Sequence, residues 1–84
     1  MLKILIVDDH QVVRRGLQMT IDAEKDMRVI AEASNGTGVL ALIKKHKPDL
    51  VLMDLQMPEM NGVDALKQIR PEYPNLPILI LTTF

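Results

Sequence analysis

The feature that most constrains the fold is a regular alternation of short apolar runs with longer amphipathic segments. Four runs, none longer than seven residues, are rich in isoleucine, valine and leucine: KILIVDD, MRVIAEA, DLVLMD and LPILILT. Their short length and β-branched residues favour strands, and the near-continuous apolarity of three of them predicts burial on both faces. Strands of this kind are typical of parallel sheets.

Three segments between these runs have helical spacing, namely HQVVRRGLQMTIDAE, NGTGVLALIKKHK and GVDALKQIRPEYP. In each, inward positions recur at steps of three and four residues, which predicts an amphipathic helix. The inward residues are Val13, Gly16, Leu17, Thr20 and Ile21 in the first, Val39, Leu42 and Ile43 in the second, and Val63, Leu66 and Ile69 in the third. Arg14 and Arg15 are expected on other faces of the first helix. Pro48, Pro71 and Pro74 separate the later helices from the strands that follow.

The resulting order, β-α-β-α-β-α-β, predicts an α/β layer fold, because right-handed crossovers place helices on both faces of a parallel sheet. With 84 residues we expect one domain at most within residues 1–84, and no linker. After three crossovers, the fourth strand is expected to present a bare apolar edge, and one sheet face a thin cover. We therefore expect either a partner on these surfaces or a longer parent chain.

The composition disfavours several classes of protein. A formal net charge of −1 and 25% charged residues argue against a large nucleic-acid surface within these residues. The apolar start, MLKILIV, is too short for a signal peptide or a membrane span. The absence of cysteine fits a reducing compartment. We therefore expect a soluble, cytoplasmic protein without a membrane contact.

The candidate chemistry lies where acidic residues follow two of the expected strands. Asp8 and Asp9 follow the first strand, and Asp54 ends the third. Ligands of open parallel sheets bind beyond the carboxyl ends of the strands, where the strand order reverses. If the first strand lies between the second and third, that point falls between Asp9 and Asp54. Three carboxylates at short range repel one another and favour a bound cation.

Mg²⁺ is the expected cation, because it binds one or two carboxylates with water and can accept phosphate oxygens. The cluster therefore predicts a phosphoryl site in which Asp54 is the nucleophile that becomes an aspartyl phosphate. Thr82, after the fourth strand, adds a hydroxyl that can donate to a phosphoryl oxygen. The loop after Asp54 can turn the backbone carbonyl of Gln56 toward the metal. Any single aspartate at a strand end is more often a turn former or helix cap, so the prediction depends on the set.

His10 follows the acidic pair and has two interpretations. It could be a general base or a metal ligand. A residue that begins a helix is favoured, because no second histidine is placed to assist it, and His46 lies at the far end of another helix.

Three stretches, ILIVDDHQVVRRGL, DLVLMDLQMPEMNGVDAL and LPILILTTF, together resemble the receiver domain of two-component response regulators. The class that they resemble is the one joined to a LuxR-type DNA-binding domain. The resemblance covers the whole chain in order and spacing, and it is specific because the Asp-Asp pair, the Asp-x-x-Met-Pro-x-Met-x-Gly motif and the strand-end threonine occur together. It implies a flavodoxin-like doubly wound parallel sheet with strand order 2-1-3-4.

The resemblance also implies roles for single residues. Asp54 is the phospho-acceptor from a histidine kinase, and Thr82 is the switch hydroxyl of a charge-triggered two-state shift. Asp9 and the Gln56 carbonyl bind Mg²⁺ directly, while Asp8 holds it largely through water. The parent chain is expected to be a transcriptional regulator rather than an enzyme, which contacts DNA only through an output domain absent from these residues.

The chain also departs from the family pattern. The family's fourth helix, fifth strand and fifth helix have no counterpart here, and its lysine and aromatic switch are absent with them. No lysine in the chain is a convincing substitute, so phosphoryl transfer should be slower. An alternative function is therefore assembly, as a homodimer or strand-exchanged oligomer through the fourth strand. A small Mg²⁺-dependent phosphohydrolase is disfavoured, because Gln56 stands where such an enzyme needs an acid/base aspartate.

Overall fold

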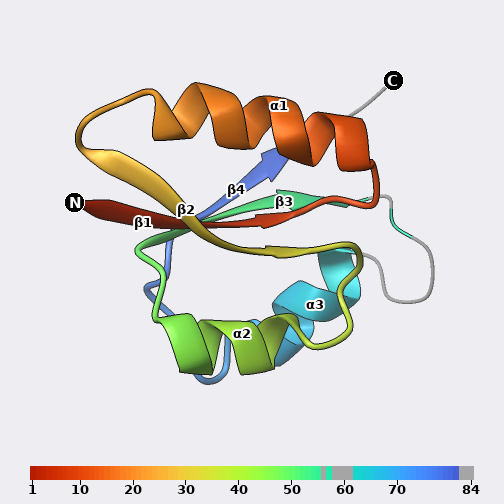
Figure 1. The fold of residues 1–84 in the computed structure, drawn as a ribbon. Coiled ribbons are helices and arrows are strands. Elements are labelled where there is room, and N and C mark those ends of the chain that lie inside the picture. The colour runs from red at the N-terminus through yellow and green to blue at the C-terminus, as the bar shows by residue number, and fades with distance from the viewer. Residues whose placement is uncertain (56, 58–61, 82–84) are drawn as a thin grey trace.

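The computed structural model describes residues 1–55, 57 and 62–81. Its elements alternate in the predicted order (Figure 1). They are β1 (Leu2–Val7), α1 (Gln11–Asp22), β2 (Met27–Ala33), α2 (Val39–His46), β3 (Leu50–Asp54), α3 (Gly62–Ile69) and β4 (Ile78–Leu81). None of the described helices is long and apolar enough to cross a membrane.

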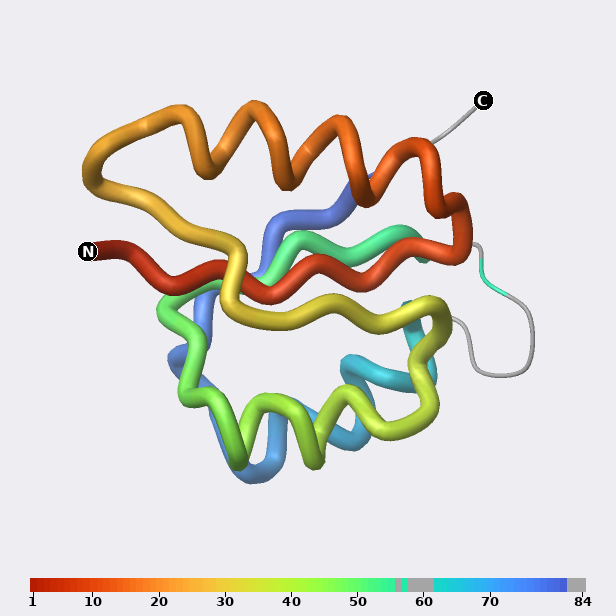
Figure 2. Tube along the Cα trace, viewed as in Figure 1, coloured from red at the N-terminus to blue at the C-terminus, as the bar shows by residue number. Residues whose placement is uncertain are grey.

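The four strands form one parallel sheet in the order β2-β1-β3-β4, which confirms the predicted order. Val7 at the end of β1 lies opposite Met53 of β3, so the residues that follow these two strands meet at one edge. The chain leaves β1 and enters α1 at this same end of the sheet (Figure 2). The register between β1 and β2 shifts once, between Ile4 and Leu5.

The helices lie on both faces of the sheet, with α1 on one face and α2 and α3 on the other (Figure 1). Side chains alternate along β1, so Leu5 and Val7 join the core beneath α2 and α3, while Ile4 and Ile6 face α1. The core on the two-helix face is the larger one. Its buried residues are Leu5, Val7, Val39, Ile43, Val51, Met53, Ala65 and Ile69.

The predicted inward face of α1 is wrong at two positions. Gly16 and Thr20 are exposed, and the Thr20 hydroxyl donates to the Gly16 carbonyl at 2.9 Å instead of packing on the sheet. Only Ile21 is buried, with Leu17 packed partly against the same cluster. The sheet therefore covers a narrower stripe of α1 than the pattern indicates.

Two further expectations concern surface residues. Val63, predicted to face inward from α3, is exposed. Within the described part of the chain, β4 pairs with β3 alone, and Leu79 of β4 is 54% exposed. The predicted bare apolar edge is thus present among these residues.

Candidate metal centre

Asp8 and Asp54 are placed side by side by the central strand pair. Asp8 directly follows β1, and Asp54 is the last residue of β3, the strand next to it. The side chains of both are buried, whereas that of Asp9 is partly exposed. Because a buried carboxylate is costly without a partner charge, this edge of the sheet is suited to a cation.

The structure brings the predicted aspartates together and adds His10 to them. Asp8, Asp9, His10 and Asp54 each offer one ligand atom, and these four atoms lie within 4.8 Å of one another. Asp8 Oδ2 is buried without a hydrogen-bond partner in the described residues. An orphaned carboxylate oxygen inside an oxygen-rich cluster matches the ligand preference of Mg²⁺, so these residues fit the expected ion.

The second oxygen of Asp8 organises the turn into α1. Asp8 Oδ1 accepts a hydrogen bond from the backbone N–H of His10 at 2.8 Å. His10 is the N-cap residue of α1, and its own side chain makes no capping hydrogen bond. The prediction that His10 begins a helix is therefore confirmed, and the Asp8 side chain holds the turn in place.

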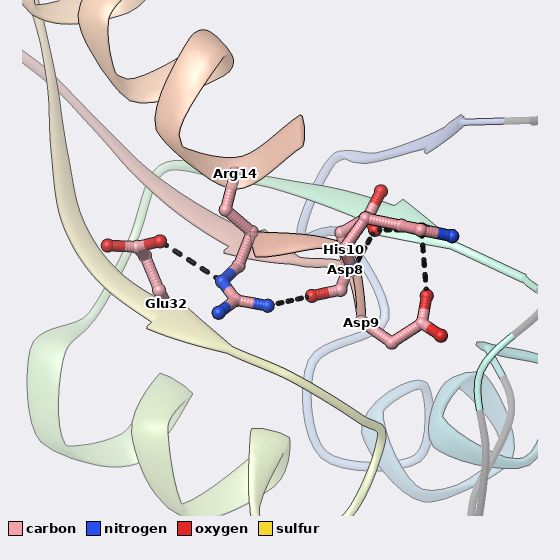
Figure 3. Close-up of polar contacts among 5 residues, drawn as sticks. All are labelled: Asp8, Asp9, His10, Arg14 and Glu32. Carbon is pink, nitrogen blue, oxygen red and sulfur yellow. Dashed lines mark hydrogen bonds and ion pairs between the residues drawn. The ribbon is translucent and has the colours of Figure 1, made fainter. Parts of the chain in front are cut away.

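The His10 ring contacts Asp8 and Asp9 (Figure 3), which the favoured interpretation of His10 as a residue that begins a helix did not predict. Its Nδ1 is 2.9 Å from Asp8 Oδ1 and 3.0 Å from Asp9 Oδ1. The hydrogen bond with Asp8, followed by the charge of Asp9, raises the pKa of His10 above its ordinary value of 6.5. The two neighbouring carboxylates thus favour the protonated imidazole over the neutral one.

Arg14 supports the cluster from α1, although the sequence pattern placed it on another face. Its Nη1 donates to the backbone carbonyl of Asp8 at 2.5 Å, and its Nε lies 3.2 Å from Glu32 Oε1 on β2 (Figure 3). The side chain is only 17% exposed. Arg14 therefore ties the backbone of an acidic residue to the neighbouring strand. Its position four residues after His10, one turn into the helix, is the only sequence signal that could have indicated this contact.

Gly62 fixes the start of α3 against the end of β3. Its N–H donates to the Leu55 carbonyl at 3.0 Å. A Cβ atom at this position would lie 2.8 Å from the carbonyl oxygen of Asp54 and 2.9 Å from the Cα of Leu55. Only glycine fits this close approach of two backbones. The sequence indicated Gly62 as the last residue of the Asp-x-x-Met-Pro-x-Met-x-Gly motif, but not this contact with β3.

Two other predicted site residues, Gln56 and Thr82, lie outside the described residues, so their roles stay predictions. Two of the lysines make contacts elsewhere. The Lys3 backbone N–H, in β1, donates to Asp49 Oδ2 at 2.8 Å, and Lys44 Nζ lies 3.2 Å from Glu72 Oε1. The cluster thus combines buried carboxylates and an imidazole at one edge of the sheet, which suits it to bind a cation.

The chain resembles known proteins over nearly all of its length. Residues 4–84 match the family described as the response regulator receiver domain. It is 46% identical over 83 residues to the uncharacterized transcriptional regulatory protein YhcZ of Bacillus subtilis, which covers 99% of this chain and 39% of that protein. It is 41% identical over 83 residues to the response regulator protein VraR of Staphylococcus aureus, over 99% of this chain and 40% of that protein.

The fold has matching solved structures as well. One is a two-component response regulator of the LuxR family from Aurantimonas sp., with a TM-score of 0.90 and 35% identity over 98% of this chain and 59% of that chain. The chain spans about two fifths of the length of the curated relatives named above.

Proposed function

The chain belongs to the response regulator receiver domain family, and we propose that it accepts a phosphoryl group on Asp54 with the help of Mg²⁺. The observation that carries the proposal is the burial of Asp54 beside Asp8, where β1 and β3 end next to each other. Two adjacent buried carboxylates repel each other and destabilise the fold unless a cation compensates them, and buried, mutually perturbing carboxylates are typical of functional sites.

Asp8, Asp9 and Asp54 would hold the ion, together with the backbone carbonyl predicted for Gln56. The ion would supply positive charge that orients and neutralises phosphoryl oxygens. The turn hydrogen bond from His10 and the Arg14 contact to the Asp8 carbonyl keep the acidic residues in place for it.

In the reaction, a carboxylate oxygen of Asp54 attacks the phosphorus of a phosphohistidine on a histidine kinase. An O–P bond forms, the N–P bond breaks, and the histidine nitrogen keeps the electron pair and takes up a proton. Thr82 would then donate its hydroxyl to a phosphoryl oxygen. The role of the chain is that of an acceptor and switch, and not of an enzyme that turns over a substrate.

We further propose that residues 1–84 are the N-terminal part of a receiver domain, whose parent protein is a cytoplasmic transcriptional regulator. The relatives support this reading, because YhcZ is named a transcriptional regulatory protein and extends well beyond the matched region. DNA binding would belong to an output domain outside these residues.

A second candidate function is assembly through β4. Leu79 is 54% exposed on a strand that has one paired neighbour among the described residues. An open apolar strand edge is a template for pairing with another chain, which would give a homodimer or a strand-exchanged oligomer. Light scattering of the chain and of Leu79→Lys tests this, because a monomer in both samples excludes it.

The phospho-acceptor function is tested by intact mass. The chain is incubated with a small phosphodonor and Mg²⁺, beside Asp54→Asn and the control Asp26→Asn, an exposed aspartate in the turn before β2. We expect one phosphoryl group on the wild-type and control chains, lost when EDTA is added and absent from Asp54→Asn. Equal labelling of Asp54→Asn would disprove the assignment.

A further inference from the structure

The distances around His10 resemble those within a metal coordination shell. His10 Nδ1 is 2.9 Å from Asp8 Oδ1 and 3.0 Å from Asp9 Oδ1. Two ligands of a tetrahedral Zn²⁺-type ion, each bonded at about 2.1 Å, are separated by about 3.4 Å. The imidazole nitrogen therefore lies within about half an ångström of the separation that ligands of a shared ion would have.

We propose that His10 is a nitrogen ligand, through which the acidic cluster also binds a transition-metal dication of the Zn²⁺ type. The inference rests on the proposed function in one respect, since it uses the same carboxylates as the Mg²⁺ site. It goes beyond that function because Mg²⁺ prefers oxygen ligands, whereas imidazole nitrogen favours first-row transition metals.

The fourth ligand atom comes from Asp54. All four candidate atoms lie within 4.8 Å of one another. Ligands of a tetrahedral ion bonded at about 2.1 Å are about 3.4 Å apart, so the widest pair must close by up to about 1.4 Å through side-chain rotation. A metal-binding arrangement thus needs no change of fold.

A second observation, the hydrogen bonding of the buried Asp8 side chain, also points to a ligand. Asp8 Oδ2 is fully buried and lacks a hydrogen-bond partner among the described residues, although Asp8 Oδ1 accepts from the His10 N–H at 2.8 Å. One oxygen is thus held in place while the other is left for a cation. Unpaired buried oxygens of this kind are uncommon in folded proteins.

The His10 ring is able to serve the metal without disturbing the core. Its backbone is fixed at the start of α1, but its side chain is 54% exposed. The cation would take the place of the proton on Nδ1 and bind the orphaned Asp8 Oδ2, and Nε2 would keep its hydrogen. A small rotation of an exposed ring is sufficient for the exchange.

Binding through His10 has a consequence for the phosphoryl site. An ion held by three carboxylates and an imidazole has fewer coordination positions left for a phosphoryl oxygen than an ion held mainly by carboxylates and water. Zn²⁺ at this site is therefore expected to oppose phosphorylation of Asp54, where Mg²⁺ supports it.

The sequence contains few other side chains that bind Zn²⁺, which simplifies the test. The chain has no cysteine and two histidines, and the second histidine, His46, ends α2. Within the described residues, no other cluster of three or more candidate ligands occurs. His46→Gln is therefore a matched control for His10→Gln, because each removes one imidazole.

The experiment is calorimetric titration of Zn²⁺ and, separately, Mg²⁺ into the wild-type chain, His10→Gln and His46→Gln. We expect one Zn²⁺ site in wild type and His46→Gln, with affinity at least about tenfold weaker in His10→Gln. Mg²⁺ affinity should not fall in His10→Gln. Unchanged Zn²⁺ affinity in His10→Gln would overturn the inference, and so would an equal loss of affinity for both ions.

A second measurement covers the case in which His10→Gln does not fold. Nitrogen-15 spectra of the histidine rings in the wild-type chain should show Nδ1 of His10 shifting on addition of Zn²⁺, while the His46 ring is unchanged. An unmoved His10 ring at saturating Zn²⁺ contradicts the inference. If the chain binds Zn²⁺ through His10 but does not bind Mg²⁺, the inference about His10 is supported, and the proposed Mg²⁺-dependent function is contradicted.

Discussion

Replacing Gly62 with alanine should destabilise the chain and disturb the end of β3 that carries Asp54. The new Cβ would lie 2.8 Å from the Asp54 carbonyl oxygen and 2.9 Å from the Leu55 Cα. Both are backbone atoms, which cannot rotate away as a flexible side chain can. The start of α3 must therefore move away from β3.

The size of the effect follows from these distances. An ordinary carbon–oxygen contact is about 3.3 Å or longer, so the Cβ is roughly 0.5 Å too close. Overpacking of this kind costs about 1 to 3 kcal/mol. Alanine recovers about 0.4 to 1 kcal/mol by restricting the unfolded chain. At the middle of both ranges the net loss is about 1.3 kcal/mol, or roughly 5 to 10 °C in melting temperature for a domain of this size.

Gly16→Ala is the matched control, because it is the same chemical change in an open environment. A Cβ at Gly16 meets nothing within 4 Å, and the residue is exposed inside α1. Alanine should therefore stabilise the chain here by about 0.5 to 1 kcal/mol. The two substitutions are expected to have opposite signs.

Urea unfolding followed by circular dichroism measures both free energies, and the intact-mass assay measures phosphoryl labelling of the same samples. We expect Gly62→Ala to lose stability and labelling, and Gly16→Ala to lose neither. If both variants shift the unfolding midpoint in the same direction by similar amounts, the close approach of α3 to β3 does not govern stability, and the reasoning is refuted.

Three further predictions concern charged residues. Arg14→Ala should weaken Mg²⁺ binding by about tenfold in calorimetry, because it removes the hydrogen bond to the Asp8 carbonyl. The control Arg15→Ala, at an exposed position, should leave the affinity unchanged, and equal Mg²⁺ affinities of the two variants would contradict a role for Arg14 in holding Asp8. Asp8→Asn should raise the free energy of unfolding in metal-free urea titrations by about 1 kcal/mol, because it removes carboxylate repulsion, but added Mg²⁺ should not stabilise it further. Stabilisation of this variant by Mg²⁺ to the same extent as wild type would rule this out. Arg70→Ala should cost about 1 kcal/mol of unfolding free energy, because its Nη1 donates to three carbonyls after α3, while Lys67→Ala should be neutral; a neutral Arg70→Ala would speak against that role.

Much of the fold was predictable because its signals are local. Apolar runs too short for helices, separated by segments with helical spacing, predicted every strand and helix that the structure contains. The strand order followed from the resemblance and was confirmed. The details of burial were less predictable: Gly16 and Thr20 have inward spacing on α1, yet both are exposed. Spacing defines a face of a helix, whereas the width of the buried stripe depends on how the helix sits on the sheet.

Some residues of the candidate site were likewise predictable from local signals in the sequence. Asp8, Asp9 and Asp54 were predictable because carboxyl ends of adjacent parallel strands meet at one edge. The predictions for Gln56 and Thr82 remain predictions, since these residues lie outside the described part of the chain.

The sequence by itself determined the element order, the parallel sheet and the acidic character of its carboxyl edge, because each depends on residue type and short-range spacing. Only the tertiary structure decided that His10 contacts two aspartates, that Arg14 joins the Asp8 backbone to β2, and that Gly62 touches the end of β3. These contacts depend on where each helix begins relative to a strand end. That position is set by packing across the whole sheet, and no short-range pattern in the sequence encodes it.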